Sequence, residues 1–441
     1  MIGLRRELGL ASLAAIVFFN VSGGPYGIED VVPSFGPGLT LVLLVLTPLV
    51  WSLPVALAMS ELASAIPDEG GYVTWVRRAF GPFWSFQVGW WSWIDSFVDV
   101  AVYPALFVEY VRFWWPGMTS VTRWLLALAF IALLTALNLA GVRPVGRLAS
   151  ALAIATLAPI AVFVICGFVT ASRVPWQPFT TRPGGVVEGL GLGLAVVMWN
   201  YSGWDTPSTC LGETRNPERT FRSAQLLVVA VITAAYVLPV AAGLGSAIDR
   251  TAWTTGALPS IATGVGGPWL GHAVAIGAVL STAGLFMSLL LTNSRLPFVL
   301  ARAGLLPDAM QSLTRRTGVP WLAIVASAAV YAVCAAFSFK ELVVLDVWLY
   351  SLSLVVELAA FIVLRRREPS LARPWRVPGG AIGALFVTVV PSAVAMLAMV
   401  TAGVTNTMAG IAAASTGPLA YFAAMRTRSR WAKRALPSNP P

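Results

Sequence analysis

Ser22-Gly23-Gly24-Pro25-Tyr26-Gly27 interrupts an apolar run that otherwise extends from about Leu8 to Val32. A second interruption lies in another long apolar segment and reads Tyr201-Ser202-Gly203-Trp204-Asp205-Thr206-Pro207. Glycine and proline in the middle of a membrane helix free backbone N–H and C=O groups that lipid cannot satisfy, so such breaks occur where they line a polar cavity or are covered by neighbouring helices. Two breaks in corresponding places of two halves point to the substrate site of a secondary transporter.

The composition is that of an integral membrane protein. Of the 441 residues, 57% are hydrophobic and only 11% are charged, whereas a soluble domain carries about 25% charged residues. The mean hydropathy is +0.78. A membrane span needs about 20 mainly apolar residues, and we expect twelve spans, at residues 8–33, 39–65, 82–110, 121–140, 147–171, 186–211, 223–246, 268–300, 320–338, 342–364, 381–403 and 406–425. The loops between them are short, so we expect one transporter domain over residues 1–441 and no signal peptide.

The basic residues are distributed unevenly between the predicted loops. If the N-terminus is cytoplasmic, most of the 29 Lys and Arg residues fall on the inner side, among them Arg77, Arg78 and the run Arg365-Arg366-Arg367. Membrane proteins carry this excess on their cytoplasmic side. We therefore interpret the net charge of +10 as a topology signal rather than as a surface for nucleic acid. Both ends are predicted to be cytoplasmic, and the expected location is the plasma membrane, a bacterial inner membrane in our interpretation.

The first break offers partial charges of both signs. A half-helix that ends before Ser22 exposes carbonyl oxygens, and one that begins near Ile28 exposes N–H groups and the positive end of its dipole. We expect a substrate amine or a sodium ion to meet the carbonyls of residues 20–22, and a substrate carboxylate to meet the N–H groups of Gly24–Gly27. Tyr26 is a candidate gate. The alternative is a structural kink that helix packing closes.

The second break adds side chains at membrane depth. Its predicted site residues are Trp199, Tyr201, Ser202, Gly203, Trp204 and Asp205. The three aromatic rings can cover an organic cation, and Trp204 is a second candidate gate. An ionisable residue inside the membrane is costly and by default a functional hypothesis, so Asp205 is predicted to bind a substrate amine, to carry a proton, or to do both. Capping of the following half-helix is a further role that it can combine with these.

The third predicted span carries a polar stripe. Trp91, Asp95, Asp99 and Tyr103 recur at every fourth position and so lie along one side of a helix. Two carboxylates at mid-membrane repel each other unless a cation or a shared proton lies between them, which is what a polyamine site or a proton relay requires. Asp99 is the better candidate for substrate binding and proton coupling, together with Tyr103. The alternative is that one of the two acids pairs with an arginine near the end of a span.

Three further acids have less specific interpretations. Glu61 ends the second span, and we expect it to form an ion pair on the cytoplasmic side, with Arg77 and Arg78 nearby. Asp346 and Glu357 lie in the tenth span without a partner that the sequence identifies.

Several function classes lack their usual signals. There is no nucleotide-binding loop and no paired nucleophile and base, so we expect neither ATP use nor enzyme activity. Cys166, Cys210 and Cys334 have no metal-ligand spacing and are read as small buried residues, and the single histidine, His272, as an interfacial one. We therefore predict no metal and no cofactor.

The ordered motifs resemble those of the amino acid–polyamine–organocation superfamily. The resemblance covers the first eight spans, and the last four match only by hydropathy. The motifs are residues 22–27, then Glu61-Leu62-Ala63 leading to Pro67 and Gly70-Gly71-Tyr72, then residues 138–141, then Gly212-Glu213 with Asn216-Pro217-Glu218-Arg219, and finally Asn293-Ser294-Arg295 with Gly304-Leu305-Leu306-Pro307. Within the superfamily the chain looks most like the branch that includes plant polyamine–proton symporters and related bacterial permeases, and the stretch from Trp199 to Asp205 is also similar to arginine–agmatine exchangers.

The resemblance implies an all-α fold with broken first and sixth helices. Five helices at residues 8–171 and five at 186–364 would form inverted repeats, followed by two extra helices at 381–425, with substrate between spans one, three, six and eight. The chain departs from the pattern at Asn20, where plant polyamine symporters tend to have an acid, and at residues 156–160, which lack the lysine of some proton-coupled members. Sodium is an alternative coupling ion, with Ser281 and Thr282 as candidate ligands.

These observations predict a secondary active transporter that works by alternating access. The substrate is expected to be an amino acid moved with protons, because the N–H groups of the first break are the clearer feature. A polyamine or organic-cation symporter or exchanger is the alternative, since a polyamine needs at least two fixed negative charges. A membrane sensor that binds without transporting is a third possibility, and an accessory subunit or a dimer is compatible with the sequence.

Overall fold

The computed structural model describes residues 4–181, 192–246, 248–336 and 339–435. The described residues form an α-helical bundle with no strand, which confirms the prediction of an all-α fold. The helices of the first part are α1 (Leu10–Val21), α2 (Val31–Phe35), α3 (Pro37–Thr47), η1 (Pro48–Ser52), α4 (Leu53–Ala65), α5 (Tyr72–Phe80), α6 (Pro82–Val111), α7 (Ser120–Leu139) and α8 (Val142–Val169). Those of the second part are α10 (Leu192–Asn200), η2 (Thr206–Glu213), α11 (Pro217–Gly245), η3 (Arg250–Ala252), α12 (Leu258–Gly266), α13 (Pro268–Asn293), α14 (Arg295–Arg302), η4 (Asp308–Gln311), α15 (Trp321–Cys334), α16 (Phe339–Arg367), α17 (Gly380–Thr401) and α18 (Val404–Ala435).

Eight stretches of the described chain are long and apolar enough to cross a membrane. They are residues 37–65, 120–139, 142–169, 217–245, 268–302, 346–367, 380–401 and 404–426. The apolar helices α1 and α15 are shorter, and α10 has only nine residues. The 30-residue helix α6 is not among the eight, and it carries Asp95, Asp99 and Glu109.

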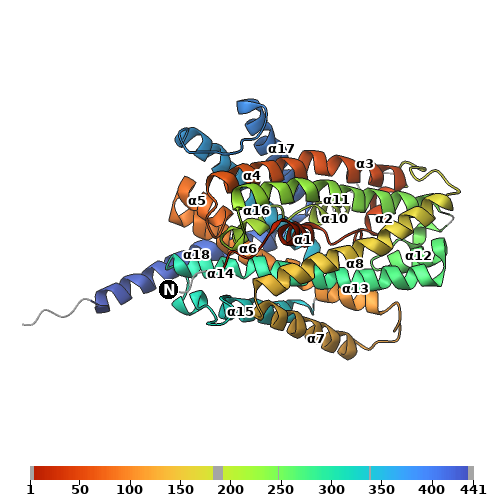
Figure 1. Ribbon diagram of the computed structural model, residues 1–441, viewed down its shortest axis with the longest axis horizontal. Helices are drawn as coiled ribbons and strands as arrows, with labels where there is room; N and C mark the ends of the chain where they lie inside the picture. The colour runs from red at the N-terminus through yellow and green to blue at the C-terminus, as the bar shows by residue number, and fades with distance from the viewer. Residues whose placement is uncertain (1–3, 182–191, 247, 337–338, 436–441) are drawn as a thin grey trace, which may run out of the picture.

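The bundle surrounds α1 with protein and leaves other helices at the edge. In α1 every residue from Leu13 to Val21 is buried, and the helix lies near the middle of the bundle (Figure 1). By contrast, α8, α17 and α18 expose many apolar side chains, such as Ile154, Ile382 and Val404, as expected of helices that face lipid. The N-terminal end of the chain and the projecting part of α18 lie at the same end of the bundle (Figure 1).

Both predicted breaks are present in the backbone. α1 ends at Val21, where the N–H groups of Ser22 and Gly23 both donate to the carbonyl of Phe18. The next helix begins at Val31, so the expectation of a half-helix from near Ile28 is corrected, because the chain makes turns up to Asp30. α10 ends at Asn200, and a 3-10 helix begins at Thr206. The N-terminal part of the predicted span 186–211 lies outside the described residues up to residue 191.

The two breaks touch each other through a glycine. Gly203 has φ of +95°, a conformation that favours glycine, and a Cβ atom there would lie 2.4 Å from the carbonyl oxygen of Asn20. A side chain at this position would therefore push the end of α1 away from the second break. The close backbone contact brings the two interruptions to one place in the bundle.

Candidate functional site

A polar cavity lies where the two breaks meet. Its volume is about 30 Å³, enough for one or two water molecules. The residues that line it are Asn20, Val21, Tyr72, Ser92, Asp95, Ser96, Asp99, Tyr103, Trp199, Ser202, Gly203, Asp205, Thr206, Leu289, Asn293, Asp346 and Tyr350. They come from α1, α5, α6, α10, the second break, α13 and α16, so segments far apart in the sequence build one site.

Four aspartates face this cavity. Asp95 and Asp99 come from α6, Asp205 from the second break, and Asp346 from α16. Among the described lining residues there is no lysine, arginine or histidine. Asp95 and Asp346 lie close enough for their carboxyl groups to share a proton. The cavity therefore gathers four carboxyl groups and has no basic side chain among its described lining residues.

Asp99 is held by two aromatic residues. Its Oδ1 accepts hydrogen bonds from the hydroxyl of Tyr103 at 3.1 Å and from the indole N–H of Trp199 at 3.2 Å. The two rings stack on each other with their centroids 5.9 Å apart. This arrangement fixes the carboxylate at the cavity wall and leaves aromatic surface beside it, which suits an organic cation. Among the residues that the structure describes, no arginine forms an ion pair with Asp99.

Asp205 belongs to a short chain of hydrogen bonds. The hydroxyl of Tyr350 donates to Asp205 Oδ1 at 2.5 Å and accepts from the N–H of Gly203 at 3.0 Å. The tyrosine thereby joins α16 to the second break. Because the side chain is buried and lines the cavity, Asp205 is placed to meet a cation or to hold a proton.

The first break uses its N–H groups internally. The N–H of Gly27 donates to Glu29 Oε2 at 2.8 Å and to the hydroxyl of Tyr110 at 3.1 Å, and the N–H of Gly24 donates to Ser22 Oγ at 3.0 Å. Glu29 Oε1 also accepts from Tyr110 at 3.2 Å and from the N–H of Leu258 at 3.4 Å. Of the N–H groups expected to bind a substrate carboxylate, that of Gly27 is therefore bonded to a carboxylate of the chain itself, and that of Gly24 to a serine hydroxyl.

Several predicted site residues lie behind the cavity wall rather than at it. Ser22, Gly23, Gly24, Pro25, Tyr26, Gly27, Tyr201 and Trp204 are not among the lining residues, whereas Asp99, Tyr103, Trp199, Ser202, Gly203 and Asp205 are. Tyr26 is buried and its hydroxyl donates to the carbonyl of Val274. The hydroxyl of Tyr201 donates to the carbonyl of Leu44, and the Trp204 indole donates to the carbonyl of Tyr201.

The candidate sodium ligands are bonded within the protein. The hydroxyl of Ser281 donates to the carbonyl of Gly23 at 2.6 Å, and that of Thr282 donates to the carbonyl of Val279 at 2.8 Å. Ser281 therefore ties α13 to the first break, which is a packing role in this conformation.

Two residues of α16 were not predicted to belong to the site. Asp346 and Tyr350 are four positions apart, as are Asp99 and Tyr103 on α6. Both pairs present a carboxyl and a phenol to the cavity. The repeated Asp-x-x-x-Tyr pattern is a signal in the sequence that could have identified them. Tyr72, Ser92 and Asn293 line the cavity as well and carry no comparable pattern.

The acid at the end of α4 has other partners than the sequence suggested. Glu61 pairs with Arg365 at 2.6 Å and with Arg373 at 3.3 Å, so the expected pairing with Arg77 or Arg78 is corrected. Arg78 instead bonds Glu368 at 2.6 Å, and this guanidinium holds the pKa of Glu368 below its usual range.

Both carboxylate oxygens of Glu357 are buried and have no hydrogen-bond partner among the described residues.

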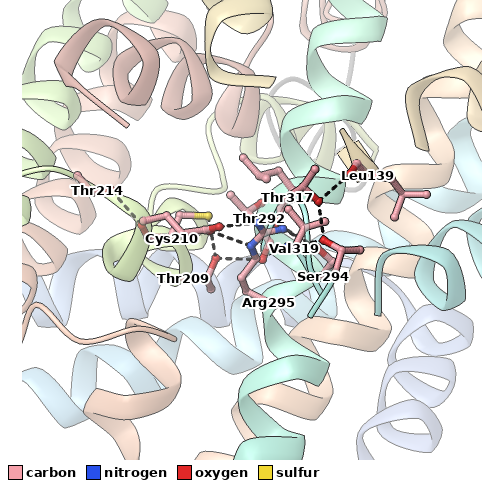
Figure 2. A network of polar contacts seen from close by, with 12 residues as sticks. Leu139, Thr209, Cys210, Thr214, Thr292, Ser294, Arg295, Thr317 and Val319 are labelled. Atoms are coloured by element: carbon pink, nitrogen blue, oxygen red, sulfur yellow. Dashed lines mark hydrogen bonds and ion pairs between the residues drawn. The ribbon is translucent and has the colours of Figure 1, made fainter. Parts of the chain in front are cut away.

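A buried polar network connects the cavity to the end of the bundle where α5 and α14 lie (Figures 1 and 2). Arg295 and Glu213 form an ion pair at 2.8 Å with side chains 0% and 1% exposed. Figure 2 shows the neighbouring bonds from Thr209 to the carbonyl of Thr292 and from Arg295 to Ser294. The hydroxyl of Thr292 in turn donates to Asn20 Oδ1 at 2.8 Å, at the cavity. The network fastens α13 and α14 to η2 and α1 on this side.

Comparison with known proteins identifies relatives along most of the chain. A family model described as "Amino acid permease" matches residues 8–424. A probable polyamine transporter of Arabidopsis thaliana is 33% identical over 389 residues, which is 88% of this chain and 78% of that protein. The polyamine transporter PUT1 of Oryza sativa subsp. japonica is 35% identical over 390 residues, 88% of this chain and 72% of that one. The serine/threonine exchanger SteT of Bacillus subtilis (strain 168) is 23% identical over 392 residues, 85% and 87% of the two chains.

Proposed function

This chain belongs to the amino acid permease family and is a membrane transporter, and we propose that its substrate is a polyamine or a related organic polycation, carried together with protons. The proposal rests above all on the four aspartates that line the cavity without a lysine, arginine or histidine among its described residues. A buried carboxylate is costly unless it is paired or protonated. A substrate with several ammonium groups supplies the missing positive charges, whereas a zwitterion would bring a further carboxylate into an acidic site.

The aromatic residues support the same substrate class. Trp199 and Tyr103 present stacked rings beside the Asp99 carboxylate. Cation–π contact with an ammonium group contributes about 0.5–2 kcal/mol, and the same faces can cover the methylene segments between charges. The plant relatives named as polyamine transporters, at 33% and 35% identity, point in this direction too.

Proton coupling follows from counting charges. A substrate with two or three ammonium groups leaves at least one of the four carboxyl groups without a cation. That carboxyl is expected to be protonated while the site is closed around the substrate. Symport requires in addition that it takes up this proton on the side where the substrate enters and releases it where the substrate leaves. Asp205 and Asp99 are the proposed carriers, and the adjacent Asp95 and Asp346 supply a pair that can share a proton.

Alternating access accounts for the size of the cavity. A volume of about 30 Å³ is far below that of a pocket for a small organic molecule, which is about 300 Å³ or more. We infer that helices around the breaks move apart to admit substrate and close again around it. The proposed framework is twelve spans, with inverted repeats at 8–171 and 186–364 followed by 381–425, and with both ends in the cytoplasm.

An amino acid remains the second candidate substrate. The family description and the serine/threonine exchanger among the relatives favour it. It requires the N–H groups of the first break to become free when substrate binds, because in the described conformation Glu29 accepts from Gly27. The two candidates therefore differ in whether Glu29 must leave its place.

Uptake into proteoliposomes with an acidic exterior tests the proposal. We expect labelled spermidine to accumulate and a labelled amino-acid mixture not to. Loss of one charge-assisted contact costs about 1.5–3 kcal/mol, so D99N and D205N are each expected to lower kcat/KM for spermidine roughly 10- to 100-fold. D308N, which neutralises an exposed acid outside the cavity, is the matched control. Accumulation of the amino acids alone would overturn the polyamine assignment.

A further inference from the structure

A second cavity, unrelated to the two breaks, lies at the junction of α16 and α17. Its volume is about 790 Å³. Four arginines line it, Arg365 and Arg366 from the last turn of α16 and Arg373 and Arg376 from the segment that leads to α17. The part of the wall contributed by α17 is apolar and includes Ala381 and Leu385. The pocket thus combines a basic side with an apolar side.

Two of the arginines are fixed by one acid. Arg365 makes a two-point contact with Glu61, at 2.7 and 2.6 Å, and Arg373 reaches the same carboxylate at 3.3 Å. The N–H of Val377 donates to Glu61 Oε2 as well. Glu61 is not among the residues that line the cavity. It therefore holds the basic wall in place from behind.

The other two arginines have no acidic partner in the part of the chain that the structure describes. Arg366 and Arg376 are exposed, and neither forms an ion pair with any described residue. The nearby Glu368 is bonded to Arg78. Burial lowers the pKa of Arg373, which Glu61 opposes and the neighbouring Arg376 and Arg365 reinforce. Four guanidiniums against one carboxylate leave a positive potential in the pocket.

We propose that this cavity binds the headgroup of an anionic phospholipid. Guanidinium groups bind phosphate oxygens in pairs of parallel hydrogen bonds, and basic pockets between membrane helices on the cytoplasmic side suit such headgroups. The apolar wall distinguishes a lipid from a soluble phosphate. Leu385 is 54% exposed and its neighbour Ile382 is 82% exposed, on a helix apolar enough to cross a membrane. That surface continues from the pocket along α17 and offers acyl chains a place to lie.

A simpler explanation of the arginines is the cytoplasmic excess of positive charge together with the negative end of the α16 dipole. This explanation requires basic residues near the helix end but no cavity. It predicts that any two arginines on this side contribute equally to attraction of anionic lipid. The pocket predicts that Arg366 and Arg376 contribute more than other exposed arginines, and this difference is measurable.

Retention of lipid on the purified full-length protein tests the site without any transport measurement, so its outcome is independent of the proposed substrate. The protein is reconstituted in nanodiscs of phosphatidylcholine with a minor fraction of phosphatidylglycerol, and co-purified lipid is counted by native mass spectrometry after release into detergent. We expect phosphatidylglycerol, and not phosphatidylcholine, to remain bound. R366Q/R376Q is expected to weaken its binding roughly 10- to 30-fold, at about tenfold or less per arginine.

The matched control is R219Q/R315Q, which removes two exposed arginines outside the cavity. It should retain phosphatidylglycerol as the unmodified protein does. Equal loss in both double variants would overturn the site in favour of unspecific surface charge. Displacement of the lipid by millimolar inorganic phosphate would assign the pocket to a soluble anion and overturn the lipid proposal. Equal unfolding temperatures of the variants establish that they are folded.

Discussion

The two breaks contain the same local arrangement. In each, a glycine N–H donates to a tyrosine hydroxyl, and that hydroxyl donates to an acid two residues after the glycine. In the first break the three residues are Gly27, Tyr110 and Glu29, at 3.1 and 3.2 Å. In the second they are Gly203, Tyr350 and Asp205, at 3.0 and 2.5 Å. The tyrosines come from α6 and α16, so each break is fastened to a long neighbouring helix.

The difference lies in what else the acid contacts. Glu29 accepts two further backbone N–H groups, from Gly27 itself and from Leu258, and does not line the cavity. Asp205 lines it. The same residue types therefore act as an internal clasp at one break and as a candidate ligand at the other. An acid in a helix break is therefore not by itself a substrate site. Whether it can bind substrate depends on whether hydrogen-bond donors of the protein already surround it and on whether it lines the cavity.

The largest loss of stability is expected at the buried ion pair that anchors the second break. Its helix η2 ends at Glu213, whose charge is balanced by buried Arg295. Removing one partner of a buried ion pair leaves the other charge buried and unpaired. R295M should therefore lower the free energy of unfolding by about 3–5 kcal/mol. Titration with sodium dodecyl sulfate in mixed micelles measures this change.

Two comparisons sharpen this prediction. R302M breaks the half-exposed Arg302–Glu69 pair, in which the arginine is 57% exposed, and should cost about 1 kcal/mol or less. The double variant R295M/E213L replaces both charges and should recover much of the stability. A loss in R295M no greater than in R302M would mean that the buried pair does not anchor the break.

A change of stability of intermediate size is expected to distinguish Glu29 from Asp205. Glu29 has three donors around its two oxygens, and the amide of E29Q must point its NH2 group at one of them. The unsatisfied donor should cost about 1–3 kcal/mol of unfolding free energy. Because Glu29 does not line the cavity, the KM for spermidine should change less than about threefold, which corresponds to well under 1 kcal/mol.

D205N is the mirror experiment. It should lower stability less than E29Q does, because the amide oxygen of asparagine can still accept from Tyr350, while it impairs spermidine uptake. Crossed results, with stability lost in E29Q and uptake lost in D205N, would support the distinction between clasp and ligand. If E29Q instead abolished uptake without loss of stability, Glu29 would belong to the transport cycle, and the comparison drawn above would fail.

Much of this comparison could be anticipated from the sequence. Glycine and proline inside long apolar runs indicated both breaks, because lipid cannot satisfy the backbone groups that they free. Acids at membrane depth indicated Asp99 and Asp205 for the same reason of solvation. These inferences depend only on local composition. In the structure, Asp99, Trp199 and Asp205 all line one cavity.

What could not be anticipated depends on contacts between distant segments. Glu29 turns back onto Gly27 with help from Tyr110, which is 81 residues away along the chain. Tyr350 reaches Asp205 across 145 residues. Neither distance nor direction is encoded in the local pattern of a helix, so the sequence alone could not identify Gly27 and Tyr110 as partners of Glu29, or place Asp346 and Tyr350 of α16 at the cavity.

The smallest changes in stability and in KM are expected when the hydroxyl of Tyr110 or of Tyr350 is removed. Each Tyr-to-Phe change removes one hydroxyl that both accepts from a glycine and donates to an acid, a contribution of about 1 kcal/mol. Y110F should appear as a small loss of stability with the KM for spermidine unchanged, because its partner Glu29 keeps two other donors. Y350F removes the only side-chain hydroxyl bonded to Asp205 among the described residues, at the cavity wall, and should raise the KM about threefold to tenfold. Concentration-dependent spermidine uptake measures both. Equal KM values in the two variants would show that the hydroxyls serve packing alone, and that the two breaks differ less in function than their surroundings suggest.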